Sequence, residues 1–267
     1  MPESYAHKKM GELVYRELPE DTRRLVKKHL KYFLAGLHGP DLLFFYRPGL
    51  DDHIREFGRK LHHTAFSGFY ENAKKQIEIF GDDEKLVYFY GVLCHFMLDS
   101  ICHPYVEKFR KEQGVTHGKL ETEYERHLLL KDGHDPQIYP VAAHVGIDRA
   151  LAGHIAPFYL GVNRKEILEC LISYKLTQTV TRLDEPVSRK AITGIMNDCG
   201  YGEKVAGLIM SHDRSETCLP AMKELDRRME IAVPAAVRAI CDFTGCLYRP
   251  EAPEPEYVKA DFYGQKA

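Results

Sequence analysis

The stretch 92-VLCHFMLDSICHPYVEKFRKEQGVTHGKLETEYE-125 decides how this chain can fold. Within it, His95, Asp99 and His103 stand four residues apart, and His117 and Glu121 repeat that spacing. Each step of four residues advances about 40° around a helix axis, so a helix places the first three side chains on one slowly drifting stripe. Two facing helices with such stripes would bring three imidazoles and two carboxylates together. That donor set suits Zn²⁺, which binds neutral imidazole nitrogen and carboxylate oxygen.

The composition is that of an ordinary globular chain. Of 267 residues, 44% are hydrophobic and 28% are charged, and the length fits one large domain or two small ones. The formal charge of −2 gives no basic field, so we expect no stable nucleic-acid partner. We find no 18-residue apolar run and no signal peptide in the charged, amphipathic N-terminus. No transmembrane segment and a cytoplasmic location are therefore expected.

The cysteines do not form a disulfide pattern. They are seven in number, at positions 94, 102, 170, 199, 218, 241 and 246, without a CxxC pair. An odd, scattered set is typical of reduced, mostly buried thiols. Cys94 and Cys102 lie near the histidine stripe, where they are either small core residues or, as a lesser alternative, thiolate ligands of zinc.

Apolar periodicity and helix-terminal residues predict helices along most of the chain. The expected ranges are 4–18, 19 to about 36, 53–80 in one or two pieces, 82 to about 103, 116 to about 130, 139–155, 163–183, 187 to about 198, and 216–245. We expect Pro104 to break or bend its helix and Pro234 to interrupt the last one. No alternating strand pattern is present. The chain is therefore predicted to be all-α, as a single multi-helix bundle.

The C-terminal end differs from the rest. Residues 249–267 are rich in proline and lack a helical period. Such a segment forms a surface strap or a disordered end. We expect one helical domain over residues 1–248, followed by this tail.

Three further places could supply metal ligands. Asp41 follows a Gly-Pro break and is most simply a turn residue, but its apolar neighbours suggest burial, and a buried carboxylate needs a partner such as a metal. His62 and His63 are adjacent, and because neighbours on a helix point about 100° apart, at most one faces a given point. His7, in the first turn of the first helix, could equally be a packed or an exposed histidine.

The order His95-x3-Asp99-x3-His103, followed by His117-x3-Glu121, resembles the zinc-dependent phospholipase C family. Single-strand-specific zinc nucleases share its fold and metal site. The preceding segment FYENAKKQIEIFGDDEKLVYFYGVLCHFMLD is similar to the long helix that leads into the first ligand pair of the family. The resemblance spans roughly residues 1 to 200. It implies a helical bundle of the zinc-dependent phospholipase C type that holds two to three zinc ions.

The resemblance also implies a ligand set for each ion. The first zinc would be held by His95, Asp99, Asp41 and one of His62 or His63. The second would be held by His103, His117 and Glu121. The third would be held by His7 and by Asp99, which bridges to it from the first. The chain departs from the family in its shorter Asp99-to-His103 gap, in having no N-terminal Trp to bind the third zinc, and in lacking an appended β-sandwich.

The implied activity is hydrolysis of a phospholipid or a related soluble phosphate ester. Zinc would acidify a water for attack on phosphorus, and Asp41 could accept its proton, so no Ser or Cys nucleophile is needed. One alternative is a zinc-dependent nuclease or nucleotidase, which would need aromatic platforms for the bases. Another is a catalytically silent module that binds zinc or phosphate. The oligomeric state is left open by the sequence.

Overall fold

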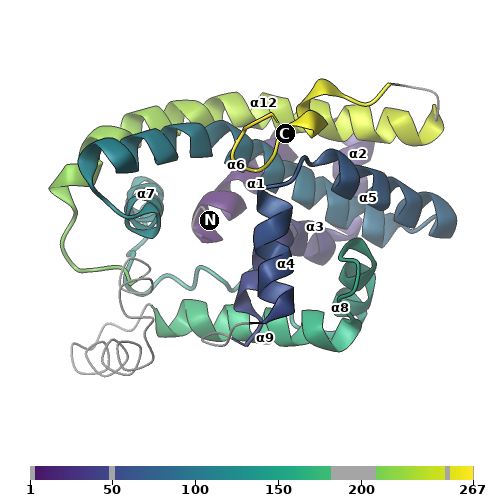
Figure 1. The fold of residues 1–267 in the computed structure, drawn as a ribbon, viewed down its shortest axis with the longest axis horizontal. Coiled ribbons are helices and arrows are strands. Elements are labelled where there is room, and N and C mark those ends of the chain that lie inside the picture. The colour runs from purple at the N-terminus through teal and green to yellow at the C-terminus, as the bar shows by residue number, and fades with distance from the viewer. Residues whose placement is uncertain (1–3, 48–51, 182–208, 250–252, 267) are drawn as a thin grey trace.

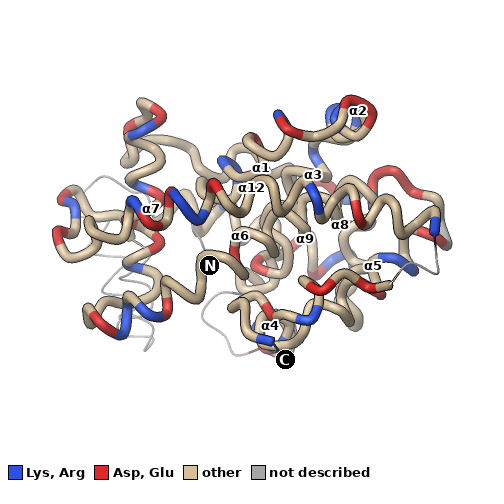
Figure 2. Tube along the Cα trace, turned by 90° about the horizontal axis from the view of Figure 1, so that it is seen from above, with Lys and Arg blue, Asp and Glu red and all other residues tan. Residues whose placement is uncertain are grey.

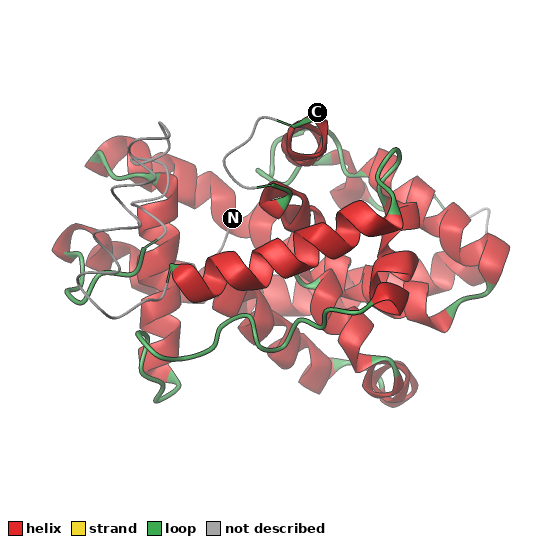
Figure 3. Ribbon diagram, turned by 90° about the horizontal axis from the view of Figure 1, so that it is seen from below, coloured by secondary structure: helices red, strands yellow, loops and turns green. Residues whose placement is uncertain are grey.

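The computed structural model describes residues 4–47, 52–181, 209–249 and 253–266, and within these ranges the elements are helices joined by loops (Figure 3). The α-helices are α1 (Ser4–Glu17), α2 (Glu20–Lys28), α3 (Leu30–Gly36), α4 (His53–His62), α5 (Ser67–Phe80), α6 (Asp83–Gln113), α7 (His117–Lys131), α8 (Arg149–Ile155), α9 (Arg164–Val180) and α12 (Leu219–Tyr248). Short 3-10 helices are η1 (Gly39–Phe45), η2 (Ala156–Phe158), η3 (Glu216–Cys218) and η4 (Glu256–Lys259). The all-α prediction is confirmed.

Helix α6 is the centre of the fold. Helix α12 runs along one edge of the molecule and packs on α6, and α9 runs along the opposite edge (Figure 1). Helix α3 packs on the other side of α6. Asp82 caps the start of α6 by accepting a hydrogen bond from the backbone N–H of Lys85, and Gly114 ends the helix in the left-handed region. Since α6 carries His95, Asp99 and His103, its neighbours determine what surrounds these side chains.

Two glycines let α3 and α6 cross with their backbones in contact. A Cβ on Gly36 would lie 2.0 Å from the Tyr88 carbonyl oxygen, and a Cβ on Gly91 would lie 2.3 Å from that of Phe33. No other residue type fits such an approach. The crossing lies one turn before His95 on α6 and directly before η1, so it brings η1 against the histidine stripe.

The two long helices continue through their prolines, so the predicted interruption at Pro234 and a break at Pro104 do not occur. Pro104 lies inside α6 and Pro234 inside α12. Each proline leaves one carbonyl four residues earlier without its helical partner. For Pro234 that residue is Glu230, which is exposed to water. The packing of both helices along their length outweighs the loss of one hydrogen bond.

Other helix predictions need smaller corrections. The range 19–36 is split at His29 into α2 and α3. Of the range 139–155, only α8 is α-helical, because Asp148 caps a new helix by accepting a hydrogen bond from the N–H of Leu151, while turns occupy the residues before it. The helix predicted from 187 to about 198 lies outside the described residues.

Charges of both signs are interspersed along the chain (Figure 2). Among the described residues, two segments, Asp83–Gln113 and Glu216–Tyr248, are long and apolar enough to cross a membrane by length and composition. The first is a core helix, since 83% of its most apolar window is buried in the protein; for the second the share is 39%. Length and composition alone are weak evidence for a membrane span, so the expectation of no transmembrane segment stays a prediction.

We call residues 253–266 the C-terminal strap. It contains η4 and runs back over α6, and its residues Val258 and Phe262 are buried. The N–H of Phe66 donates to the carbonyl of Ala260, and the N–H of Phe262 donates to the carbonyl of His62. The described part of the tail is therefore packed against the helical core.

Candidate metal centre

The structure brings eight of the nine ligand candidates together. They come from five elements: His7 on α1, Asp41 on η1, His62 on α4, His95, Asp99 and His103 on α6, and His117 and Glu121 on α7. All but His117 are at least 95% buried, and the His117 side chain is 23% exposed.

The first part of the centre surrounds His95. Its Nε2 lies 3.3 Å from Asp99 Oδ2 and 4.0 Å from Asp41 Oδ2. His62 Nε2 is 2.8 Å from Asp41 Oδ1. His7 Nε2 is 3.5 Å from Asp99 Oδ1, and its ring stacks on that of His95 with centroids 4.2 Å apart. Two groups with ligand spacing result, His7/His95/Asp99 and Asp41/His62/His95.

The second part lies between α6 and α7. Glu121 Oε1 is 2.7 Å from His117 Nε2 and 3.5 Å from His103 Nε2. Thr116 begins α7 by accepting a hydrogen bond from the N–H of Lys119, which places His117 in the first turn and Glu121 one turn later. These three residues form a third group with ligand spacing.

Four of the histidines have one ring nitrogen already engaged. The Nδ1 contacts are His62 with Gly58 O (2.7 Å), His95 with Leu37 O (3.1 Å), His103 with Phe262 O (2.8 Å) and His117 with Glu107 Oε1 (2.9 Å). Each acceptor requires the proton to be on Nδ1, which leaves the Nε2 lone pair facing the centre. Metal-binding histidines in proteins are oriented in this way.

Several buried polar atoms at the centre make no hydrogen bond in the protein. They are both ring nitrogens of His7, both oxygens of Asp99, and Nε2 of His95 and His103. Burying such a group without a partner costs about 1–3 kcal/mol, and more when it is charged. Divalent cations bound to nitrogen and oxygen donors would satisfy these atoms, except for the one nitrogen of His7 that carries its proton, and the mixture of imidazole and carboxylate fits zinc.

Electrostatics prepare these groups for a cation. Burial lowers the pKa of His7 well below its usual value and lowers that of His95 to about 4. Burial alone would raise the pKa of Asp41, but the nearby His95 and His62 outweigh it and hold that pKa at about 2. Burial, followed by the charge of Asp41, raises the pKa of Asp99 well above normal. The imidazoles of His7 and His95 are thus neutral at pH 7, as metal binding requires.

His63 is the candidate that the structure leaves out. Its side chain is exposed and stacks on the Tyr263 ring with centroids 4.7 Å apart, whereas its neighbour His62 is buried beside Asp41. Among the described residues, His63 belongs to no group with ligand spacing. The adjacent pair diverges around the end of α4, as expected for neighbours on a helix.

The two cysteines near the stripe are core residues. Cys94 and Cys102 are buried, and burial raises the pKa of both thiols. A neutral thiol is a poor zinc ligand. Neither residue belongs to a group with ligand spacing among the described residues, so the thiolate alternative has no structural support.

Sequence reasoning missed the residues that support the ligands. Glu107 holds His117 and also pairs with Arg110 Nη2 at 2.7 Å. Phe262 and Tyr263 of the strap pack on His95 and His103. His38 is buried, and its Nε2 lies 2.8 Å from Nε2 of His144. The sequence could not identify Glu107 as a partner of His117, because the two residues lie on different helices and meet across the turn between them.

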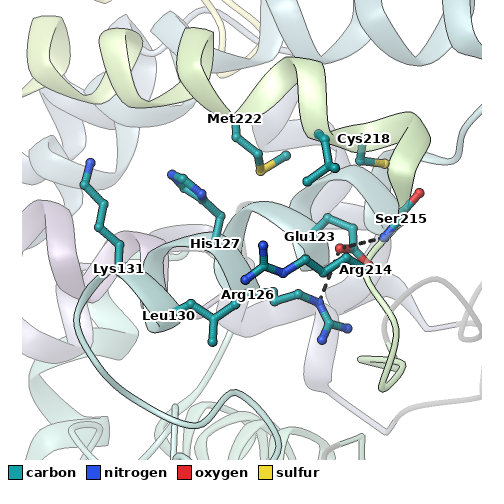
Figure 4. Close-up of a pocket in the computed structure, with 10 residues that line it drawn as sticks. Glu123, Arg126, His127, Leu130, Lys131, Arg214, Ser215, Cys218 and Met222 are labelled. Carbon is teal, nitrogen blue, oxygen red and sulfur yellow. Dashed lines mark hydrogen bonds and ion pairs between the residues drawn. The ribbon is translucent and has the colours of Figure 1, made fainter.

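A separate cavity of about 260 Å³ lies between α7 and the start of α12 (Figure 4). It is lined by Glu123, Arg126, His127, Leu130, Lys131, Arg214, Ser215, Cys218, Leu219 and Met222, none of which is a ligand candidate. Its buried carboxylate Glu123 already pairs with Lys119 and Arg126 and accepts from the N–H of Ser215. The cavity therefore presents no donors comparable to those of the metal centre.

Comparison with known proteins agrees with this chemistry. The model of a family described as zinc dependent phospholipase C matches residues 6–186, a range that contains all eight clustered candidates and ends before α12 and the strap. No curated protein and no solved structure matches the chain. Because the family match covers more than half of the sequence, the chain belongs to the zinc-dependent phospholipase C family.

Proposed function

We propose that this protein is a zinc-dependent phosphodiester hydrolase that cleaves a phospholipid or a related soluble phosphate ester. The observation that carries the proposal is the convergence of buried imidazole and carboxylate atoms without hydrogen bonds, within the range matched by the family. A purely structural polar core would pair these atoms with one another or with backbone groups. Their common orientation toward one centre supports a role in binding cations.

The three groups suggest how the ligands are shared. Asp41, His62 and His95 would hold one zinc, and His103, His117 and Glu121 a second. Asp99 lies between His95 and His7, at 3.3 and 3.5 Å, which suits a carboxylate that bridges to a third ion. Bound zinc would lower the pKa of an attacking water and neutralise charge on the phosphate oxygens.

We assign Asp41 the role of proton acceptor as well as ligand. Its pKa of about 2 keeps the carboxylate ionised at neutral pH. The same low pKa makes it a weak base, so it can take a proton only from a water that is already strongly acidified. Asp41 and the zinc ligands would therefore have to act on the same water.

The exposed edge of the centre determines where substrate enters. Of the eight clustered residues, His117 has the most exposed side chain, and the partly exposed Tyr263 lies beside it with ring centroids 6.5 Å apart. We place the phosphate ester on this side, with its leaving group directed toward solvent. The buried His95 and Asp99 would then bind zinc without contacting substrate.

The test is hydrolysis by the zinc-loaded protein of a chromogenic phosphocholine ester, a chromogenic nucleotide diester and single-stranded DNA. We expect turnover of the phosphocholine ester, and we expect Asp41→Asn to lower kcat by at least 100-fold, in the range of general-base contributions. Asp242→Asn, an exposed change on α12, serves as the control. Cleavage of the nucleic acid alone would replace the proposal with the nuclease alternative. Full zinc occupancy without turnover of any substrate would indicate a binding module.

A further inference from the structure

The C-terminal strap supplies a support for the metal centre from outside the matched family range. Three of the four Nδ1 acceptors, on Gly58, Leu37 and Glu107, lie within residues 6–186. The fourth, the carbonyl of Phe262, is separated from His103 by 159 residues. We propose that the strap is a working part of the metal centre that positions His103 for the zinc shared with His117 and Glu121. This inference rests on the proposed zinc site.

A hydrogen bond from the strap fixes the orientation of His103. Its ring is 1% exposed, and its Nδ1 lies 2.8 Å from the Phe262 carbonyl oxygen. That oxygen can only accept, so the bond selects the tautomer with a free lone pair on Nε2, 3.5 Å from Glu121 Oε1. Without the strap, nothing else among the described contacts of His103 would select this tautomer. The strap therefore fixes His103 in the tautomer that can bind zinc, before zinc binds.

Two aromatic rings of the strap pack on the ligands. Tyr263 stacks on His103 with centroids 4.9 Å apart and an interplanar angle of 27°, and its ring also stacks on His63. Phe262 packs on His62 and His95, with centroids 4.8 and 5.5 Å apart. The strap thus restricts rotation of the His103 ring by stacking and by hydrogen bonding. The hydrogen bond engages Nδ1, so it leaves the metal-facing Nε2 available.

A compact turn and a close contact with α6 hold the strap in place. Asp261 Oδ1 accepts hydrogen bonds from the N–H groups of Tyr263 (2.8 Å) and Gln265 (2.9 Å), which forms a compact turn. Gly264 follows with φ +68°, and a Cβ there would lie 2.3 Å from the carbonyl oxygen of Ser100. Ser100 is the residue whose carbonyl loses its helical partner to Pro104. Because the backbone of α6 is the obstacle, any side chain at position 264 must shift the strap or the helix.

The experiment measures how tightly each zinc is held when the strap is disturbed. Gly264→Ala introduces the clash, and Gly81→Ala is the matched control, since Gly81 also has a positive φ (+55°) but a Cβ placed on it would meet nothing within 4 Å. Tyr263→Ala removes the stacked ring, and Tyr263→Phe keeps it. Zinc content is followed during titration with a chromophoric zinc chelator, alongside circular dichroism of each variant.

We expect one zinc to be held more weakly in Gly264→Ala and Tyr263→Ala, by about 10- to 100-fold, as for loss of other groups that orient metal ligands. The remaining zinc should be released as in the wild type. Gly81→Ala and Tyr263→Phe should hold every zinc as the wild type does. General destabilisation would not weaken the binding of one zinc ion alone, and it would not explain normal zinc binding by Tyr263→Phe beside weakened binding by Tyr263→Ala.

Unchanged zinc release from both Gly264→Ala and Tyr263→Ala would overturn the inference, and so would equal loss of every zinc. These outcomes differ from failure of the proposed function, in which the wild type binds zinc but cleaves none of the phosphodiesters. A wild type that binds no zinc would overturn both. The readout is metal affinity, so it does not depend on which substrate is tested.

Discussion

At the scale of single residues, the centre is defined by which atom of each ligand is left available. The Nδ1 atoms of four histidines contact a carbonyl or a carboxylate, and the opposite nitrogens face inward. The histidine and carboxylate positions could be predicted from their spacing. Their acceptors could not, because three of them are backbone carbonyls whose positions depend on the fold and carry no residue signature. The choice between His62 and His63 was also open, because it depends on how the fold orients the end of α4.

Asp99 should make the metal-free protein less stable than its amide variant. Its pKa in the folded protein is raised well above normal, mainly by burial, so the folded state keeps a proton that the unfolded chain loses above about pH 4. As pH rises from 4 to 7, wild type should therefore lose stability relative to Asp99→Asn. We expect a difference on the order of 1 kcal/mol at pH 7 and much less at pH 4.

Urea unfolding of the zinc-free proteins at both pH values measures this difference. Exposed Asp242→Asn provides the control and should show no such dependence. The same Asp99→Asn variant should bind zinc more weakly, because it lacks the bridging carboxylate. A zinc-free Asp99→Asn protein that is less stable than wild type at pH 7 would contradict the assigned role of burial.

Glu107 should tune the zinc affinity of His117 without touching the metal. Its Oε1 lies 2.9 Å from His117 Nδ1. Hydrogen bonds from Arg110 and then from His117 outweigh the effect of burial and lower the pKa of Glu107 to about 2. An ionised acceptor makes the imidazole a stronger ligand. We expect Glu107→Gln to lower the affinity for one zinc ion by about 10-fold, measured by competition with a chelator. Glu112→Gln, an exposed change on the same helix, should leave affinity unchanged.

At the scale of elements, the backbone crossing of α3 and α6 places the first ligands. Gly36 and Gly91 bring the helices into contact, so Leu37 can accept from His95 and η1 can present Asp41. Gly39, with φ +43°, lets the chain pass close to the His95 ring. Sequence patterns predicted most helices but not this crossing, since a glycine in a helix shows only that a side chain is absent.

Gly91→Ala should therefore destabilise the fold, although alanine favours helices. Its Cβ would lie 2.3 Å from the Phe33 carbonyl oxygen, and over-packing of this kind costs about 1–3 kcal/mol. Gly245, on α12, is the matched control, because a Cβ placed on it would meet nothing within 4 Å. Gly245→Ala should stabilise by about 0.5–1 kcal/mol in denaturant titrations. Equal effects at the two positions would argue against the close crossing.

Proline positions and local composition are poor guides to whether a segment is ordered or where a helix ends, and the strap is one example. Residues 249–267 lack helical period, and a surface strap or a disordered end was the reasonable interpretation. Two buried residues, Val258 and Phe262, nevertheless anchor the described part. Likewise, Pro104 was expected to break or bend its helix, yet α6 continues past it to Gln113 and bears Glu107, which contacts His117. Tertiary packing decides both cases, and it is not a local property of the sequence.

At the scale of the whole molecule, the metal centre joins parts of the chain that are far apart. Ligand candidates from α1, η1, α4, α6 and α7 meet at one place, and the strap closes over it. A cation that binds only the folded arrangement stabilises it by mass action, by about 2.7 kcal/mol at 100 times its Kd. Removing zinc with a chelator should lower Tm by roughly 5–10 °C for a domain of this size. Added Zn²⁺ should restore the Tm, whereas Mg²⁺ should not, because imidazole donors suit it poorly.

The most direct test of the central claim is the zinc content of the purified wild-type protein and of His117→Ala, measured by plasma emission spectrometry with phosphodiesterase activity alongside. His117 is the most exposed of the eight candidates, so its truncation is the one least expected to disturb the core. We predict two to three zinc ions per chain in the wild type, one fewer in His117→Ala, and loss of activity in the variant. A wild-type protein that holds no zinc after refolding with the metal would contradict the account.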